Sequence, residues 1–353
     1  MDEATTLTDA GLLIGLCQYD EAERLLEGLV RWAEERGDDG LASHALEGLG
    51  TIATRQGREA QALELFERAL AAAGDPDPAE RESLYSNTAR LRAYGGDPGG
   101  AVALLEEVLS RVESQADHDV AVFAHYAISL SYAYADSGDY GKAGTVLARV
   151  LRDGGEDLDL RVRQRLYYAL TRLNINTGRT DQAVEYGRKT LDLTISAGLE
   201  EFVFESYHQL AYTLLDAGDT EEAGRYLTEA RGHAQGPLDE GFLEVEWARY
   251  ALQLGDLDGA IAHADAAIDL LADRAVPGVL GRAYLVKARA YEALGEPSRA
   301  DGAYLMAIDG LEQQTGWPTD LAKACRRYGK FLRSQGRLDA AMRMLERAGD
   351  AGI

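Results

Sequence analysis

The sequence predicts an all-α protein, a right-handed α-solenoid of about nine helix-turn-helix repeats and about eighteen helices. Three observations predict this fold. A glycine followed by four residues and an alanine recurs along the chain, the recurrence has a period of about 40 residues, and an amphipathic run follows each alanine. Periods of roughly 20–50 residues are typical of solenoids, in which each unit buries its apolar face against its neighbours.

Composition and charge narrow the class of protein. The 353 residues are 46% hydrophobic and 27% charged, a globular balance, and 60 Asp and Glu against 36 Lys and Arg give a formal net charge of -24. That charge disfavours a general nucleic-acid or membrane-surface binder. The sequence lacks an apolar run of membrane-spanning length, and its start lacks the regions of a signal peptide. Two cysteines, Cys17 and Cys325, fit a reducing compartment, so we expect a cytoplasmic protein.

Eight regular copies of the motif and one degenerate copy account for nearly the whole chain. In the degenerate first copy, Cys17 takes the place of the glycine and is followed by Ala22. This coverage leaves no room for a separate catalytic domain. The regular pairs are Gly57 and Ala62, Gly96 and Ala101, Gly138 and Ala143, Gly178 and Ala183, Gly218 and Ala223, Gly255 and Ala260, Gly295 and Ala300, and Gly336 and Ala341.

Each motif is expected to join two helices. The glycine suits the left-handed residue that ends the first helix, and aspartates after it, such as Asp139, Asp219 and Asp256, suit the N-cap of the second. The alanine stands where the two helices come close. Large apolar residues are expected to pack opposite small ones, namely Phe66, Leu105, Leu147, Leu227, Tyr304 and Leu345.

The turn-rich segments between the units are too short to be flexible linkers between domains. We therefore predict a single superhelical domain over residues 1–353. Its repeats span roughly residues 4–40, 41–79, 80–117, 118–158, 159–199, 200–238, 239–278, 279–318 and 319–353.

This pattern resembles the tetratricopeptide repeat, whose signature combines an aromatic or large apolar residue, a small residue and Gly-x4-Ala. The common repeat has about 34 residues, shorter than the units here. The longer units are similar to those of bacterial peptide-sensing domains of Rap-type quorum-sensing regulators and of helix-turn-helix regulators. HEAT repeats share the length but lack the glycine–alanine motif. The second repeat carries the signature at Leu46, Leu49, Gly50, Gly57, Ala62, Phe66 and Ala69.

The resemblance implies that the first helix of each repeat lines a concave groove. The position six residues before each motif glycine should point into that groove, and it is mostly basic or tyrosine. From the second repeat onward it holds Thr51, Arg90, Tyr132, Arg172, Tyr212, Arg249, Arg289 and Lys330. Neighbouring groove positions add Asn87, Tyr168 and Asn176.

We interpret these side chains as a binding surface for an extended ligand that bears carboxylates, such as a peptide or an acidic protein segment. Arginine offers a planar fork to a carboxylate, and tyrosine offers contact area and a hydroxyl. Asn87 and Asn176 would hold the peptide backbone, as asparagines do in the peptide-sensing relatives, or serve only as polar helix residues. The alternative for the arginines is internal pairing with groove acids such as Asp136 and Asp216.

The last repeat is rich in basic residues that few acids oppose. Arg326, Lys330 and Arg333 form a candidate patch for a partner. The alternative is a solvated polar cap, which the final repeat of a solenoid needs.

No metal-binding, nucleophile-elbow or phosphate-loop motif occurs, so we expect no cofactor, no metal and no enzymatic activity. The predicted function is a peptide-binding or protein-binding adaptor or sensor, with a homodimer left open. One alternative is the ligand-sensing part of a helix-turn-helix transcription regulator. Its DNA-binding part, about 60–70 residues, does not precede Thr5 here. An enzyme is the second alternative.

Overall fold

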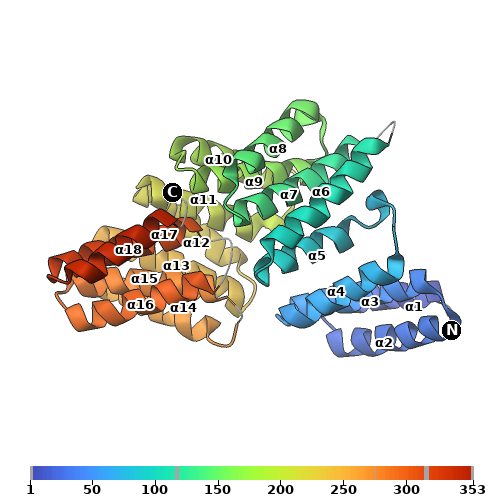
Figure 1. Ribbon diagram of the computed structural model, residues 1–353, viewed down its shortest axis with the longest axis horizontal. Helices are drawn as coiled ribbons and strands as arrows, with labels where there is room; N and C mark the ends of the chain where they lie inside the picture. Colours follow the sequence, from blue (N-terminus) through green and yellow to red (C-terminus); the bar gives the residue numbers. More distant parts are fainter. Residues whose placement is uncertain (1–2, 116–118, 275, 314–317, 351–353) are drawn as a thin grey trace. The chain divides into compact units, whose positions relative to one another are not determined.

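The computed structural model describes residues 3–115, 119–274, 276–313 and 318–350. Within these ranges the chain forms eighteen α-helices, three short 3-10 helices and no strand (Figure 1). The α-helices follow one another as nine antiparallel hairpins, so the predicted all-α solenoid class is confirmed. None of the described helices is long and apolar enough to cross a membrane.

The first helices of the nine hairpins have odd numbers and the second helices have even numbers. The first helices are α1 (Glu3–Gly15), α3 (Asp39–Arg55), α5 (Glu82–Tyr94), α7 (Val120–Asp136), α9 (Leu160–Asn176), α11 (Val203–Ala217), α13 (Pro237–Leu254), α15 (Pro277–Ala293) and α17 (Pro318–Ser334). The second helices are α2 (Tyr19–Arg36), α4 (Glu59–Ala73), α6 (Pro98–Ser114), α8 (Tyr140–Asp153), α10 (Thr180–Ser196), α12 (Thr220–His233), α14 (Leu257–Leu271), α16 (Pro297–Glu312) and α18 (Leu338–Asp350). The 3-10 helices are η1 (Pro78–Glu80), η2 (Gly155–Asp157) and η3 (Glu200–Phe202).

The turn inside each hairpin has the predicted left-handed residue. All eight motif glycines have positive φ, from 70° at Gly178 to 92° at Gly96. In the degenerate first copy, Cys17 adopts φ 59° and is the one non-glycine residue with positive φ among the residues described. Residues with a Cβ rarely adopt this conformation. The turn nevertheless keeps its left-handed backbone at Cys17, where the glycine is absent.

The predicted N-caps are also confirmed. The side chains of Asp139, Asp219 and Asp256 each accept a hydrogen bond from the backbone N–H three residues further on, at 3.0, 3.2 and 2.9 Å. Each bond satisfies one of the N–H groups that a helix start leaves without a partner. Together the glycine and the aspartate reverse the chain within a few residues.

The core of each hairpin is built around the motif alanine. All eight of these alanines are at most 3% exposed. Small residues face large ones as predicted: a Cβ added to Gly50 on α3 would lie 2.9 Å from the ring of Phe66 on α4. Leu345 on α18 also packs opposite a small residue, because a Cβ added to Gly329 on α17 would lie 2.9 Å from its Cγ, but its side chain is 39% exposed. No described helix follows α18 to cover it.

Contacts divide the chain into two compact units, Met1–Ala133 and Tyr134–Ile353. A core in the first unit includes Leu26, Ile52 and Phe66, and a core in the second includes Leu210 and Leu227. The single domain over residues 1–353 stays a prediction.

We expect Ala183→Arg to lower the free energy of unfolding of the second unit by more than about 3 kcal/mol. The substitution would force a long charged side chain between α9 and α10, where Ala183 has no exposed surface. The matched control is Gln182→Arg, one residue earlier and exposed, which should unfold close to the parent. Urea denaturation followed by circular dichroism compares the three proteins. Equal midpoints for both variants would show that the repeat register is misplaced.

Candidate functional site

The predicted site residues all lie on first helices, but they divide between the two units. Those in the first unit are Asn87 and Arg90 on α5 and Tyr132 on α7. Those in the second unit are Tyr168, Arg172 and Asn176 on α9, Tyr212 on α11, Arg249 on α13, Arg289 on α15, and Arg326, Lys330 and Arg333 on α17.

In the first unit, Arg90 contacts two residues of its own helix. Its Nη2 lies 3.4 Å from the Asn87 Oδ1, and its guanidinium lies 5.6 Å from the ring centre of Tyr94. Tyr132 is half-buried on α7. The described contacts in this unit join Arg90 to Asn87.

In the second unit, Tyr212 contacts two arginines. The guanidinium of Arg249 lies 4.6 Å from the Tyr212 ring centre, and that of Arg282 lies 4.7 Å from it. Both distances suit cation–π attraction. The three side chains come from α11, α13 and α15, so first helices of successive hairpins do present them to one another. Sequence reasoning missed Arg282, although it lies seven residues before Arg289 and therefore on the same helix face.

A buried carboxylate lies beside these arginines. Glu246 on α13 is 0% exposed; it accepts a hydrogen bond from the Arg249 Nη1 at 2.5 Å and forms an ion pair with Arg282. Burial acts to raise the pKa of Glu246, but Arg249, Arg282 and His208 outweigh it and lower the pKa to about 2. Glu246 is therefore ionised at neutral pH. The sequence analysis did not single it out.

The first helix of the last hairpin, α17, also contacts this group of side chains. The Lys323 Nζ on α17 lies 3.1 Å from the Asp216 Oδ2 on α11. These residues are 107 positions apart in the sequence. On the same helix, Asp320 lies 3.6 Å from the Arg282 Nε, and Arg249 also pairs with Asp216. The second unit therefore joins four first helices through one group of side chains, the polar cluster: Tyr212, Asp216, Glu246, Arg249, Arg282, Asp320 and Lys323.

His208 on α11 is a titratable group beside the polar cluster. Its ring stacks between Phe204 and Phe242, with centre distances of 5.8 and 6.2 Å. Burial lowers the pKa of His208, with the positive charge of Arg282 and Arg249 acting in the same direction and Glu246 against it. The imidazole is therefore neutral at pH 7.

The internal pairing that the sequence left open is present at two of the predicted arginines. The Arg172 Nη2 lies 2.6 Å from the Asp136 Oδ1, whose side chain is 5% exposed, and Arg249 is paired as described above. Burial raises the pKa of Asp136 above its ordinary value, and the ion pair with Arg172 offsets this only in part. Asn176 and Arg289 are half-buried on the same series of helices.

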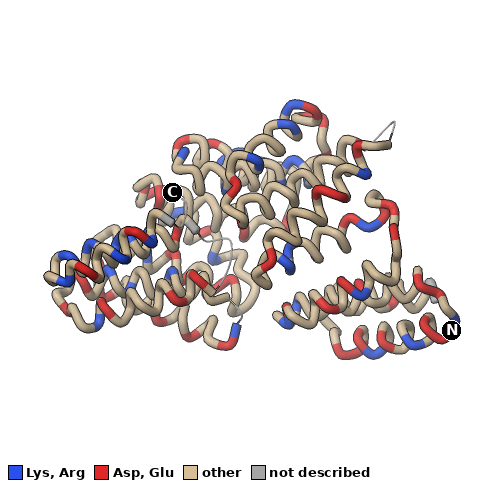
Figure 2. Tube along the Cα trace, viewed as in Figure 1, with Lys and Arg blue, Asp and Glu red and all other residues tan. Residues whose placement is uncertain are grey.

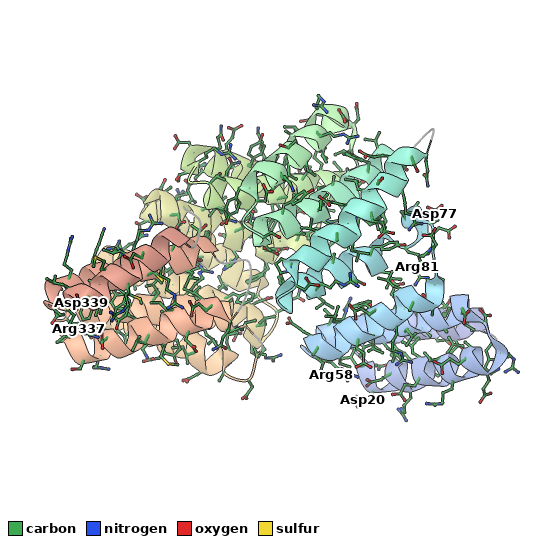
Figure 3. All side chains as sticks on the ribbon, viewed as in Figure 1. Asp20, Arg58, Asp77, Arg81, Arg337 and Asp339 are labelled. Carbon is green, nitrogen blue, oxygen red and sulfur yellow. The ribbon has the colours of Figure 1, made fainter. Side chains whose placement is uncertain are left out.

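The basic patch of the last hairpin is partly neutralised. Lys323, Arg337 and Arg347 pair with acids of other helices, and Figure 3 shows Arg337 at the start of α18. The patch residues themselves, Arg326, Lys330 and Arg333, are all exposed on α17. In the part of the chain that the structure covers, no group of three or more His, Cys, Asp or Glu side chains could hold a metal ion.

Two segments of the chain match family models of the tetratricopeptide repeat, at residues 2–75 and 204–230. The first segment contains α1 to α4, and the second covers most of the hairpin of α11 and α12. The resemblance to this family is confirmed. No curated protein sequence matches the chain.

Solved structures share the fold at low sequence identity. The apo quorum sensor NprR from B. thuringiensis is 16% identical with a TM-score of 0.64, covering 88% of this chain and 87% of its own. The Rap conjugation gene regulator of plasmid pLS20, in complex with the Phr* peptide, is 13% identical with a TM-score of 0.60, covering 93% and 95%. Aspartyl phosphate phosphatase F from Bacillus subtilis is 12% identical with a TM-score of 0.63, covering 81% and 75%. At these identities the likeness concerns the fold.

We expect Glu246→Gln to lower the free energy of unfolding at pH 7 by about 3–5 kcal/mol, the range for removing one partner of a buried ion pair. The variant leaves Arg249 and Arg282 beside a neutral amide, at a position where the carboxylate has no exposed surface. The matched control, Glu240→Gln, changes an exposed residue of the same helix and should stay within about 0.5 kcal/mol of the parent. A small effect at Glu246 would contradict a buried carboxylate paired with the two arginines.

The same variant should show a defined dependence on pH. The pKa of Glu246 is lower in the folded protein, about 2, than in the unfolded chain. Its stabilising contribution is therefore complete above the unfolded value, and it is lost as the pH falls through the folded one. The stability gap between parent and Glu246→Gln, measured by urea denaturation, should narrow between about pH 5 and pH 2. A gap that stays constant would contradict the ionised, paired state.

Proposed function

We propose that this chain is a non-enzymatic adaptor or sensor of the cytoplasm, which binds an extended peptide or protein segment on its first helices. The observation that carries the proposal is the polar cluster of the second unit, where α11, α13, α15 and α17 present charged and aromatic side chains on one face. The repeat fold supports it, as does the binding of a peptide by the structurally similar Rap regulator.

The physical chemistry of the cluster favours a binding role over a purely structural one. Buried ion pairs contribute little net stability, because removing charges from water opposes their attraction. Apolar side chains could join the same helices without that penalty. An arginine has five N–H donors, so Arg249 retains donors beyond those used for Glu246 and Asp216. Arg172 is 29% exposed, which leaves its guanidinium within reach of a ligand.

The proposed ligand class follows from these donors. Carboxylates match the guanidinium fork, and the half-buried Tyr168 and Asn176 on α9 add a phenol and an amide for a peptide backbone. Acting as a sensor, the protein would work by population shift. A ligand that competes for Lys323 or Asp216 would favour the state in which α17 and α11 are no longer joined.

Recovery of the ligand tests this proposal directly. The full chain, purified from its native host, should carry peptides or protein segments that mass spectrometry identifies, and the resynthesised segment should bind the purified protein. Recovery of no segment, or of segments that fail to bind again, would contradict the proposed function.

Paired substitutions then locate the binding face. Arg172→Gln with Asp136→Asn removes an ion pair between the first helices α7 and α9 and leaves no unpaired charge, and we expect about a tenfold loss of affinity for the recovered segment. The matched control, Arg188→Gln with Glu222→Gln, removes a similar pair between the second helices α10 and α12, and it should bind like the parent. Isothermal titration calorimetry measures both. Equal losses would contradict the assignment to first helices.

A further inference from the structure

The helices α15 and α17 lie side by side in a register that one ion pair defines. The Arg282 Nε on α15 lies 3.6 Å from the Asp320 Oδ2 on α17. Residues seven positions apart lie on the same face of a helix, two turns along. Seven residues beyond Arg282 is Arg289, and seven residues beyond Asp320 is Arg327. The first position of this register pairs the basic Arg282 with the acidic Asp320. The corresponding position two turns further along therefore places two basic residues, Arg289 and Arg327, side by side.

The basic residues around this position differ in their ion pairing from the other basic residues of the last hairpin. Lys323, Arg337 and Arg347 in the same hairpin are all ion-paired. Over the ranges that the structure describes, no carboxylate forms an ion pair with Arg289, Arg326, Arg327 or Lys330. Residues 318–350 hold eight basic and four acidic residues in a chain whose net charge is -24, and blue segments recur along α17 and α18 in Figure 2.

Arg289 is held where an unpaired charge is unfavourable. It is half-buried on α15. Burial, and next the like charge of Arg327, lower the pKa of Arg289, and Glu292 on the same helix offsets this only in part. The Glu292 carboxylate instead accepts a hydrogen bond from the Tyr304 hydroxyl at 2.6 Å. An added anion between Arg289 and Arg327 would remove the repulsion between them.

We propose that Arg289 and Arg327 form a carboxylate-binding site, with Lys330 one turn further along α17. The occupant is a carboxylate of the bound peptide or protein segment, so this inference rests on the proposed function and assigns where an acidic group of that ligand is held. Two guanidinium groups on neighbouring helices can hold one carboxylate from both sides. The site joins Arg289, predicted for the groove, to the basic patch of the last hairpin, predicted separately.

A peptide of known charge tests the site in the full chain. The probe is fluorescein-labelled hexaglutamate, with hexaglutamine as the neutral comparison, and fluorescence anisotropy at constant ionic strength measures binding. We expect the parent to bind hexaglutamate and not hexaglutamine, and Arg289→Gln and Arg327→Gln each to bind at least about tenfold more weakly. The matched control, Arg343→Gln, removes the same charge from an exposed position on α18 and should bind within about twofold of the parent.

Three outcomes would overturn the site. Equal losses in all three variants would mean that the net charge of the last hairpin attracts the probe without a defined site. Failure of the parent to bind hexaglutamate would remove the carboxylate assignment. Binding of hexaglutamine as tight as that of hexaglutamate would show that charge is not recognised.

Thermal unfolding gives a second measurement that needs no peptide. Glutarate, compared with sodium chloride at equal ionic strength, should raise the Tm of the parent and leave that of Arg327→Gln unchanged. Without ligand, Arg327→Gln should melt no lower than the parent, because it removes a repulsion rather than a contact. A larger shift with inorganic phosphate than with glutarate would overturn the choice of carboxylate.

The two proposals fail in different ways. If a segment recovered from the host binds the parent and Arg327→Gln equally, the carboxylate site is wrong and the proposed function stands. If glutarate raises the Tm as expected but no segment is recovered, the site stands and the proposed function fails.

Discussion

Two helices can approach each other closely only where the side chain between them is small, and in this chain the motif alanine supplies that contact in every hairpin. The close approach requires a short turn, which the left-handed glycine and the capping aspartate provide. Once the hairpin is formed, its two helices present different faces, and the apolar faces pack on the hairpins before and after. The polar positions of the first helices then recur at regular intervals because the hairpins do. The candidate site is in this sense a product of the packing of small residues.

The side chains on the first helices of the second unit show how such a surface is specified. Tyr212, Arg249 and Arg282 come from three successive hairpins and would be unrelated in an unfolded chain. The buried Glu246 holds both arginines in place and keeps them charged. The arginines are thereby positioned before any ligand arrives, which reduces the entropy that a ligand must lose in ordering them. Preorganised donors of this kind suit a binding protein.

The sequence predicted the features of the fold that depend on neighbouring residues. The turn glycines, the N-caps and the buried alanines are local, so a repeated motif specifies them. Even Cys17 was correctly placed at the turn. The packing of Leu345 opposite a small residue was predicted as well, but its partial exposure was not, because full burial would need another helix packed on α18.

Less of the candidate site could be predicted from the sequence. The motif period identified the helices and the faces that carry Arg172 and Arg249. It could not choose between a ligand and Asp136 or Asp216 as their partners, because ion pairing depends on which acid faces across from the next hairpin. Glu246 was missed since an ionised carboxylate without exposed surface has no signature in one sequence.

The contact between Lys323 and Asp216 has a consequence for how the second unit comes apart. In an ideal repeat array each hairpin touches only the next, so the ends fray independently of the middle and the stability is a sum of nearest-neighbour terms. A bond between residues 107 positions apart adds a long-range term to that sum. Opening of the hairpin that contains α17 then also affects α11, three first helices earlier, and the unit gains cooperativity that a simple stack of hairpins would lack.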